Sequence, residues 1–134
     1  MTEISLKSRC AIAGIGNTAY TRGTEHTTIE LHLQAALAAL DDAGLSPADV
    51  DGVMPNEMSG VIAEDLILNL GLSNLRFAAT IRTGGASFVT ALQAACTAVA
   101  TGVARCVLIP GGRRGYSAQR VSKISEGTMV PMPV

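Results

Sequence analysis

The stretch RTGGASFVTALQAACTAVATGVARCVLIPGGR, residues 82–113, decides the fold of this chain. It predicts a turn of glycines, a long helix without a charged residue, a stop at Gly102 and then a buried strand. A helix that begins on glycine directly after a strand leaves its first N–H groups without partners in the helix. Such groups can hold a developing anion, so we expect a site at this helix start.

The uncharged helix also predicts how the fold is layered. A helix with no polar face is buried on every side, whereas one layer of strands covers only one side. We therefore expect another layer, from a second domain or another chain. The chain stops at Val134 after two prolines, without a closing element, which also predicts half of a larger fold. A membrane span needs roughly 20 mainly apolar residues, but the glycines and threonines of residues 83–104 favour a core helix.

Composition limits the class of protein. The 134 residues are 48% hydrophobic and 16% charged, which suits one folded domain and excludes disorder. A net charge of −1 gives no reason to expect a nucleic-acid partner. Basic residues gather late in the sequence. They form either a solvated face or a rim that meets the phosphates of a cofactor such as coenzyme A; they are Arg105, Arg113, Arg114, Arg120 and Lys123.

The cysteines indicate a reduced compartment. Cys10, Cys96 and Cys106 are an odd number, and each lies in an apolar run, so they read as small buried residues and not as a disulfide set. The residues before Cys10 include charges and no long apolar core, so no signal peptide is expected there. We expect a cytoplasmic protein.

Strands and helices alternate along the sequence. Thr27 and Glu30 form a capping box that starts a helix, and Gly44 ends it. Alternation of this kind predicts an α/β fold with a mixed, mostly parallel sheet. The expected strands are a short one beginning at Cys10 and ending in glycines, then residues 50–54, 76–82 and 105–110; the other expected helices are a capped turn at 46–49, a helix marked by Ile62 to Leu70 and the uncharged helix 86–101.

Two stretches carry a resemblance to a known family. AIAGIGNTAYTRGTEHTTIELHLQAALAALDDAGLSPADVDGVM resembles the amino-terminal segment of thiolases, especially the sterol-carrier type, and GGASFVTALQAACTAVATGVARCVLIPGG resembles their nucleophile-bearing helix and the strand that follows. Thiolases have two similar halves around a central pair of buried helices. The resemblance covers the first half only. It implies a thiolase-like domain at 1–116 and a loop region at 117–134 that leads to a second half.

The sequence departs from thiolases at the nucleophile. Thiolases carry a cysteine at the start of the buried helix, where the helix dipole favours the thiolate, but this position aligns with Gly85. Cys96 lies about three turns further along and is expected to be buried and inert. Ser87 is either a nucleophile or, as we favour, a residue that bonds the helix start, because no histidine is seen to approach it. We expect no catalytic residue and no metal site here.

The glycine pair in place of the cysteine resembles the cysteine-less thiolase-like proteins of lipid and steroid side-chain breakdown. That resemblance implies cleavage or formation of a carbon–carbon bond beside the thioester carbonyl of an acyl-CoA substrate, with no cofactor beyond that thioester. Gly84, Gly85, Ala86 and Ser87 would bind the substrate through their N–H groups. The acid and base residues would lie beyond Val134, so this part alone is expected to be inactive.

The resemblance also leaves alternatives open. The complete protein could be a conventional acetyl-CoA acetyltransferase, or a non-catalytic thiolase-like subunit. The resemblance implies a small OB-fold partner protein. It also implies a second copy of the chain, because the strand matching 76–82 lies near the dimer axis of thiolases. No nucleic acid or membrane is expected. Gly14 and Gly16 resemble a dinucleotide turn, but Ala19 replaces its third glycine, so we interpret these glycines as a tight turn.

Overall fold

The structure is a computed structural model that describes residues 5–55 and 60–116. Its centre is a parallel sheet with strand order β2-β1-β3. The strands are β1 (Gly52–Val53), β2 (Phe77–Ala78) and β3 (Val107–Leu108), and the α-helices are α1 (Thr28–Asp42), α2 (Ala63–Leu70) and α3 (Ser87–Ala100). This arrangement confirms the predicted α/β class. The boundary predicted at 116 is untested, and the predicted loop region 117–134 lies outside the described residues.

The helices begin and end where the sequence predicts. At α1, the Thr27 hydroxyl accepts from the Glu30 N–H at 3.3 Å, and the Glu30 carboxylate accepts from the Thr27 N–H. Gly44 follows with φ of +66°, and Gly71 ends α2 with φ of +65°, a conformation that glycine adopts without a steric penalty. The capped turn at Ser46 is also present, as a 3-10 helix at Pro47–Asp49.

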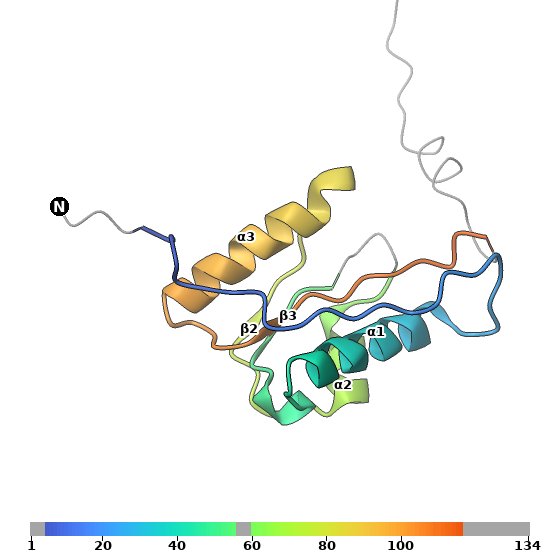
Figure 1. Cartoon of the computed structure of the whole chain (residues 1–134), viewed down its shortest axis with the longest axis horizontal. Coiled ribbons are helices and arrows are strands. Elements are labelled where there is room, and N and C mark those ends of the chain that lie inside the picture. Colours follow the sequence, from blue (N-terminus) through green and yellow to red (C-terminus); the bar gives the residue numbers. More distant parts are fainter. Residues whose placement is uncertain (1–4, 56–59, 117–134) are drawn as a thin grey trace, which may run out of the picture.

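The two faces of the sheet carry different helices. Figure 1 shows α1 and α2 on one side of the strands and α3 on the other. Along each strand the side chains alternate between the faces: Val53 and Leu108 join the cluster under α1 and α2, while Met54 and Val107 join the cluster under α3. The sheet is therefore a central layer between two separate apolar clusters.

Asp51 and Gly52 hold the three strands together. The buried Asp51 carboxylate accepts the N–H groups of Arg105, at 2.8 Å, and Cys106, at 2.9 Å. Its backbone carbonyl accepts from Phe77 at 3.0 Å. A Cβ on Gly52 would lie 2.8 Å from the Val107 side chain, so only glycine allows β1 and β3 to approach this closely. Each strand is shorter than predicted, and β3 begins at Val107, directly after the two N–H groups that this carboxylate takes.

The predicted strand at Cys10 is wrong. Residues 10–20 contain no strand, and Figure 1 shows them as an extended trace beside α1. A Cβ on Gly16 would lie 2.3 Å from the Ala35 carbonyl oxygen, and one on Gly14 would lie 2.3 Å from that of Ala39. The Ile15 N–H donates to the Asp42 carboxylate at 2.9 Å. These glycines therefore form no tight turn; they let the segment lie against the helix backbone.

The uncharged helix α3 is buried along one stripe. Ala91, Ala95 and Ala98 face the sheet and are buried, while Phe88 and Val89 on other sides are 47% and 72% exposed. Burial on every side, as predicted for an uncharged helix, is thus not reached within the described residues. One layer of strands covers one side of α3, as expected, and the apolar residues on its other sides still lack a cover.

Candidate functional site

The site predicted from the sequence lies at the carboxyl edge of the sheet. In a parallel sheet this edge is where ligands bind, because the loops that follow the strands meet there. The chain from β2 leads into the start of α3, and the chain from β3 leads into residues 111–116. Figure 1 shows residues 111–116 on the right of the view, beside residues 20–26, and the start of α3 above the strands.

The glycine turn at the start of α3 is open. Residues Gly84–Ala86 form one 3-10 turn before the helix, and Gly84 has φ of +60°. A Cβ on Gly85 would meet nothing within 4 Å. The N–H groups of Ala86 and Ser87 already donate to the carbonyls of Thr83 and Gly84. These two bonds do not involve the N–H groups of Gly84 and Gly85. Of the four predicted residues, Gly84 and Gly85 are therefore the ones whose N–H groups we consider for substrate binding.

Ser87 bonds the helix start. It is 4% exposed, and its hydroxyl donates to the Gly84 carbonyl at 2.8 Å and accepts from the Thr83 N–H at 3.1 Å. Both described histidines belong to the other face: His32 is on α1, and His26 lies just before it. This matches our preferred interpretation of Ser87, because a serine nucleophile needs an adjacent base.

None of the cysteines lies at the glycine turn. Cys96 is on the third turn of α3, where it is only partly buried, less than predicted. A hydrogen bond with Cys10 raises the pKa of the Cys96 thiol above its ordinary value, and burial adds to this. Burial raises the pKa of the Cys106 thiol, with a further contribution from the Asp51 carboxylate. Thiols with raised pKa values are poor nucleophiles at neutral pH.

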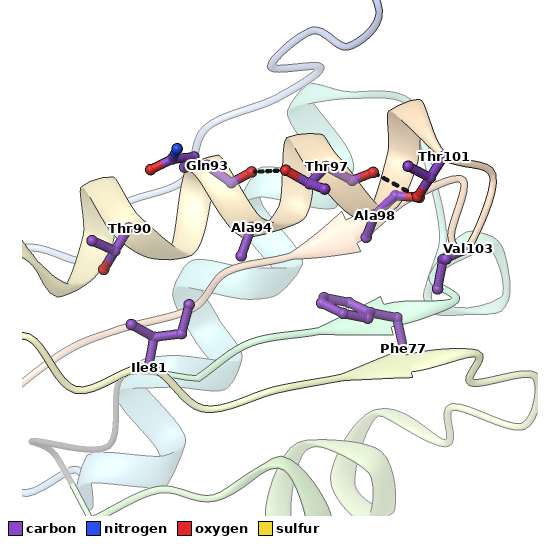
Figure 2. Close-up of a pocket in the computed structure, with 9 residues that line it drawn as sticks. All are labelled: Phe77, Ile81, Thr90, Gln93, Ala94, Thr97, Ala98, Thr101 and Val103. Carbon is purple, nitrogen blue, oxygen red and sulfur yellow. Dashed lines mark hydrogen bonds between the residues drawn. The ribbon is translucent and has the colours of Figure 1, made fainter. Parts of the chain in front are cut away.

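A groove of about 570 Å³ runs between α3 and the strand segment β2. Figure 2 shows Phe77 and Ile81 on one wall and the helix on the other. The helix threonines bond their own backbone: Thr97 donates to the Gln93 carbonyl at 3.0 Å, and Thr101 donates to the Thr97 carbonyl at 2.8 Å. The hydroxyls are thus satisfied within α3, and the groove presents a largely apolar wall.

A second cavity, of about 460 Å³, lies where residues 16–24 meet α1 and the loop 111–116. Sequence reasoning did not connect these segments, although it noted both the GIGNTAY glycines and the basic residues of GGRRGYS. The only signal in the sequence was the adjacent Arg113 and Arg114, which were predicted to form either a solvated face or a phosphate-binding rim. Both arginines line this cavity.

No helix in the described part of the chain is both long and apolar enough to cross a membrane. Within residues 5–55 and 60–116, no group of three or more histidine, cysteine, aspartate or glutamate side chains is placed to hold a metal ion.

Comparison with known proteins gives a consistent result, although no protein-family model matches the sequence. The chain is 38% identical over 132 residues to the 17-hydroxy-3-oxo-4-pregnene-20-carboxyl-CoA lyase of Mycobacterium tuberculosis, covering 93% of the chain and 34% of the lyase. It is 36% identical over 103 residues to the steroid side-chain-cleaving aldolase of Thermomonospora curvata, covering 77% of the chain and 26% of the aldolase. The chain thus spans about a third of the length of these relatives or less.

Solved structures agree with these relatives. The Ltp2-ChsH2(DUF35) aldolase matches with a TM-score of 0.77 and 31% identity, over 89% of this chain and 32% of that one. The 3-oxoacyl-[acyl-carrier-protein] synthase III of Aquifex aeolicus matches with a TM-score of 0.60 and 24% identity, over 72% of this chain and 34% of that one, which supports the fold alone.

Fold and relatives together define the class: the chain is thiolase-like. Within that class the chain is similar to the steroid side-chain aldolase and lyase.

Proposed function

We propose that the complete protein cleaves or forms a carbon–carbon bond next to the thioester carbonyl of an acyl-CoA, in lipid or steroid side-chain metabolism, without a cysteine acyl-enzyme. The observation that carries this proposal is the open glycine turn at Gly84 and Gly85, which has no thiol beside it. The names of the two curated relatives support the substrate class, because one is a carboxyl-CoA lyase and the other cleaves steroid side chains.

The proposed reaction is a retro-aldol cleavage. A base removes the proton from a hydroxyl group on the carbon β to the thioester carbonyl, and the electrons of that O–H bond form a new carbonyl. The electron pair of the carbon–carbon bond moves to the neighbouring carbon, which gives an enolate with negative charge on the thioester oxygen. Protonation of that carbon then releases a shortened acyl-CoA. The thiolase resemblance implies that the base and acid come from beyond Val134.

The described residues would act on the enolate. The N–H groups of Gly84 and Gly85 lie at the start of α3, where the helix dipole favours negative charge. A donor held ready at a developing oxyanion lowers the barrier by about 3 kcal/mol. Ser87 would act indirectly, because its hydroxyl fixes the turn through Thr83 and Gly84.

The proposal includes partners. We propose a homodimer and a small OB-fold partner protein, both implied by the thiolase-like resemblance. The match to the Ltp2-ChsH2(DUF35) aldolase supports a partner protein, because that aldolase has two named components. No cofactor other than the coenzyme A thioester of the substrate is proposed.

Substitution at Gly85 tests the proposal. A Cβ there would meet nothing within 4 Å, so Gly85→Val should keep the fold while its side chain occupies the open turn. We expect a loss of turnover of roughly 100-fold or more in the full-length protein, with an unchanged melting curve. Ala38→Val, at an exposed position of α1, is the control and should retain activity. Normal turnover in Gly85→Val would show that the turn has only a structural role.

Mass spectrometry separates this reaction from ordinary acyl transfer. After incubation with an acyl-CoA, we expect no covalent mass increase, because Ser87 is engaged in the turn and Cys96 is remote from it. A stoichiometric acyl adduct on either residue would overturn the proposed chemistry and favour a conventional acetyltransferase. Full-length protein that binds its partner but turns over no acyl-CoA would instead indicate a non-catalytic subunit.

A further inference from the structure

Two of the three cysteines are neighbours in the structure although they lie far apart in the sequence. Cys10 begins the amino-terminal segment that lies on α1, and Cys96 is on the third turn of α3. Their thiols share a hydrogen bond, and both side chains are partly exposed. The sequence predicted separate buried thiols, whereas the structure shows a pair that a reagent in solution can reach.

The course of the amino-terminal segment explains this contact. The Arg9 N–H donates to the Leu6 carbonyl at 3.2 Å, so a turn directly precedes Cys10. Beyond Cys10 the segment continues to α1, where Gly14 and Gly16 lie against the helix backbone. Figure 1 shows this segment, in blue, running from α3 toward α1. A bond at Cys10 would therefore tie α3 to a segment that packs on the other face of the sheet.

The surroundings of the pair favour a disulfide between these two cysteines and not with the third. A disulfide needs the two sulfur atoms about 2.05 Å apart, and the hydrogen bond already holds the thiols next to each other. Cys10 lies outside the helices and strands, so it can move toward α3 without breaking a helix. Cys106 packs against the cluster under α1 and α2, on the opposite face of the sheet from α3.

We infer that Cys10 and Cys96 form a reversible disulfide when the protein meets a low-molecular-weight disulfide such as oxidised glutathione. The Cys10 thiolate attacks one sulfur of that reagent, and the other half leaves as a thiolate that takes up the proton lost by Cys10. The Cys96 thiolate then displaces the second half from Cys10, and this half takes up the Cys96 proton. The two protein thiols are oxidised, and one reagent molecule is reduced to two thiols.

The order of the two attacks follows from the state of Cys96. The hydrogen bond with Cys10 and burial both raise the pKa of the Cys96 thiol, which disfavours its thiolate, so the first attack comes from Cys10. In a reducing compartment such a disulfide forms transiently and responds to oxidation. The inference is independent of the proposed function, because neither thiol lies at the glycine turn.

Peptide mapping of the full-length protein tests the inference, with oxidised glutathione as the probe. After the free thiols are alkylated, trypsin cleaves after arginine and so places the three cysteines in separate peptides, residues 10–22, 83–105 and 106–113. Without a reductant, mass spectrometry should find peptides 10–22 and 83–105 joined, less two hydrogen atoms, and peptide 106–113 alkylated. Dithiothreitol should separate the joined pair. The oxidised protein should also melt a few degrees higher than the reduced protein.

Variants and a denatured control make the test specific. Cys10→Ser and Cys96→Ser should each abolish the joined peptide and the higher melting temperature, whereas Cys106→Ser should keep both. A disulfide that fits the fold should form about tenfold or more readily in the folded protein than in urea, which tests the wild-type chain without any substitution. Separate glutathione adducts on Cys10 and Cys96, a disulfide that includes Cys106, or equal yields with and without urea would each overturn the inference.

Discussion

The two faces of the sheet differ in how far this chain completes them. Under α1 and α2, eight hydrophobic residues are buried in one cluster, and the segment around Gly14 and Gly16 lies against α1 as well. Under α3, the cluster among the described residues has three buried members. The helix itself leaves Phe88, Val89 and Leu92 exposed by 47%, 72% and 40%. One face is thus a finished core, and the other resembles an interface.

The chemistry of the helices follows this difference. Helix α1 has a capping box and charged residues on its solvent side, as a surface helix should. Helix α3 has neither charge nor a side-chain cap, and its Thr97 and Thr101 hydroxyls bond the helix carbonyls. A covering layer would therefore meet no unpaired hydroxyl there, so burying this side costs little in lost hydrogen bonds. The presence or absence of charged residues on a helix therefore indicates which face of the sheet a partner would cover.

The largest expected effect is association through the α3 face. Apolar patches beyond a few hundred Å² are unusual on soluble monomers, so residues 1–134 alone should dimerise, aggregate or bind a dye that reports apolar surface. Light scattering at tens of micromolar measures this. A monodisperse monomer of 13.8 kDa with cooperative melting would contradict both the missing layer and the predicted interface.

A matched pair of variants locates that association. Val89, on α3, and Leu68, on α2, are exposed to similar extents, 72% and 79%. Val89→Lys should reduce dye binding and the associated fraction, whereas Leu68→Lys should not. Equal effects of the two lysines would mean that the two faces do not differ in this respect.

The next largest effect is expected from Asp51, because its hydrogen bonds hold together the sheet that separates the two faces. Asp51→Ala leaves the N–H groups of Arg105 and Cys106 without their acceptor, and we expect a loss of about 2–4 kcal/mol in the free energy of unfolding. Urea titration measures it. Asp49→Ala is the control, because Asp49 is exposed and its carboxylate accepts from Ser46 within the same turn; it should cost about 1 kcal/mol. Equal losses would show that the buried carboxylate is not needed.

A smaller effect is expected where the amino-terminal segment lies on α1. In Gly16→Ala the new methyl group would clash with the Ala35 carbonyl and the Ala39 N–H, so the segment must shift, at about 1–3 kcal/mol. The thermal midpoint and proteolysis of the segment both report this. Gly85→Ala adds the same methyl group in open space and should leave the midpoint unchanged. If the two variants melt alike, the segment does not lie against α1.

The smallest effect concerns pH. His32 is fully buried on the finished face, and burial lowers its pKa from the ordinary value of 6.5. Below pH 6.5 the unfolded chain therefore binds more protons than the folded one. The free energy of unfolding should fall as pH decreases from 6.5, until the folded-state pKa is passed. His32→Gln should remove this dependence and His26→Gln should keep it, as urea midpoints across that range would show. A slope that survives in His32→Gln would contradict the assignment.

Local signals in the sequence were enough for the helices. Thr27 with Glu30, the glycines 44 and 71, and the uncharged run after Gly85 each act within a few residues, so their effect can be recognised without a fold. The strand expected at Cys10 failed because an apolar run with glycines suits either a strand or a segment lying on a helix. Only the position of α1 decides between them. The bonds of Asp51 to the residues directly before β3 were likewise hidden in the sequence, because they join positions more than 50 residues apart.

Part of the candidate site could be predicted from local signals in the same way, and part could not. The glycine turn could be located in the sequence, because Gly84 to Ser87 stand directly between a strand and a helix. The role of Ser87 needed its two hydrogen bonds. The cavity of about 460 Å³ could not be predicted, because it joins residues near Tyr20 with Arg113 and Arg114 across most of the chain. Separation of this kind leaves no periodic pattern in the sequence.

His32 also makes the molecule observable by magnetic resonance. Its Nδ1–H donates to the Thr28 carbonyl at 2.8 Å, and a proton so placed in a fully buried ring exchanges slowly with water. Gly112, in the loop that lines the cavity, lies over the same ring, 3.5 Å from its Nδ1 to the position of a Cβ. The chain has two histidines, and His26 is exposed. Two imidazole signals, one from a buried ring and one from an exposed ring, would therefore give a simple spectrum in which each ring reports on a different environment.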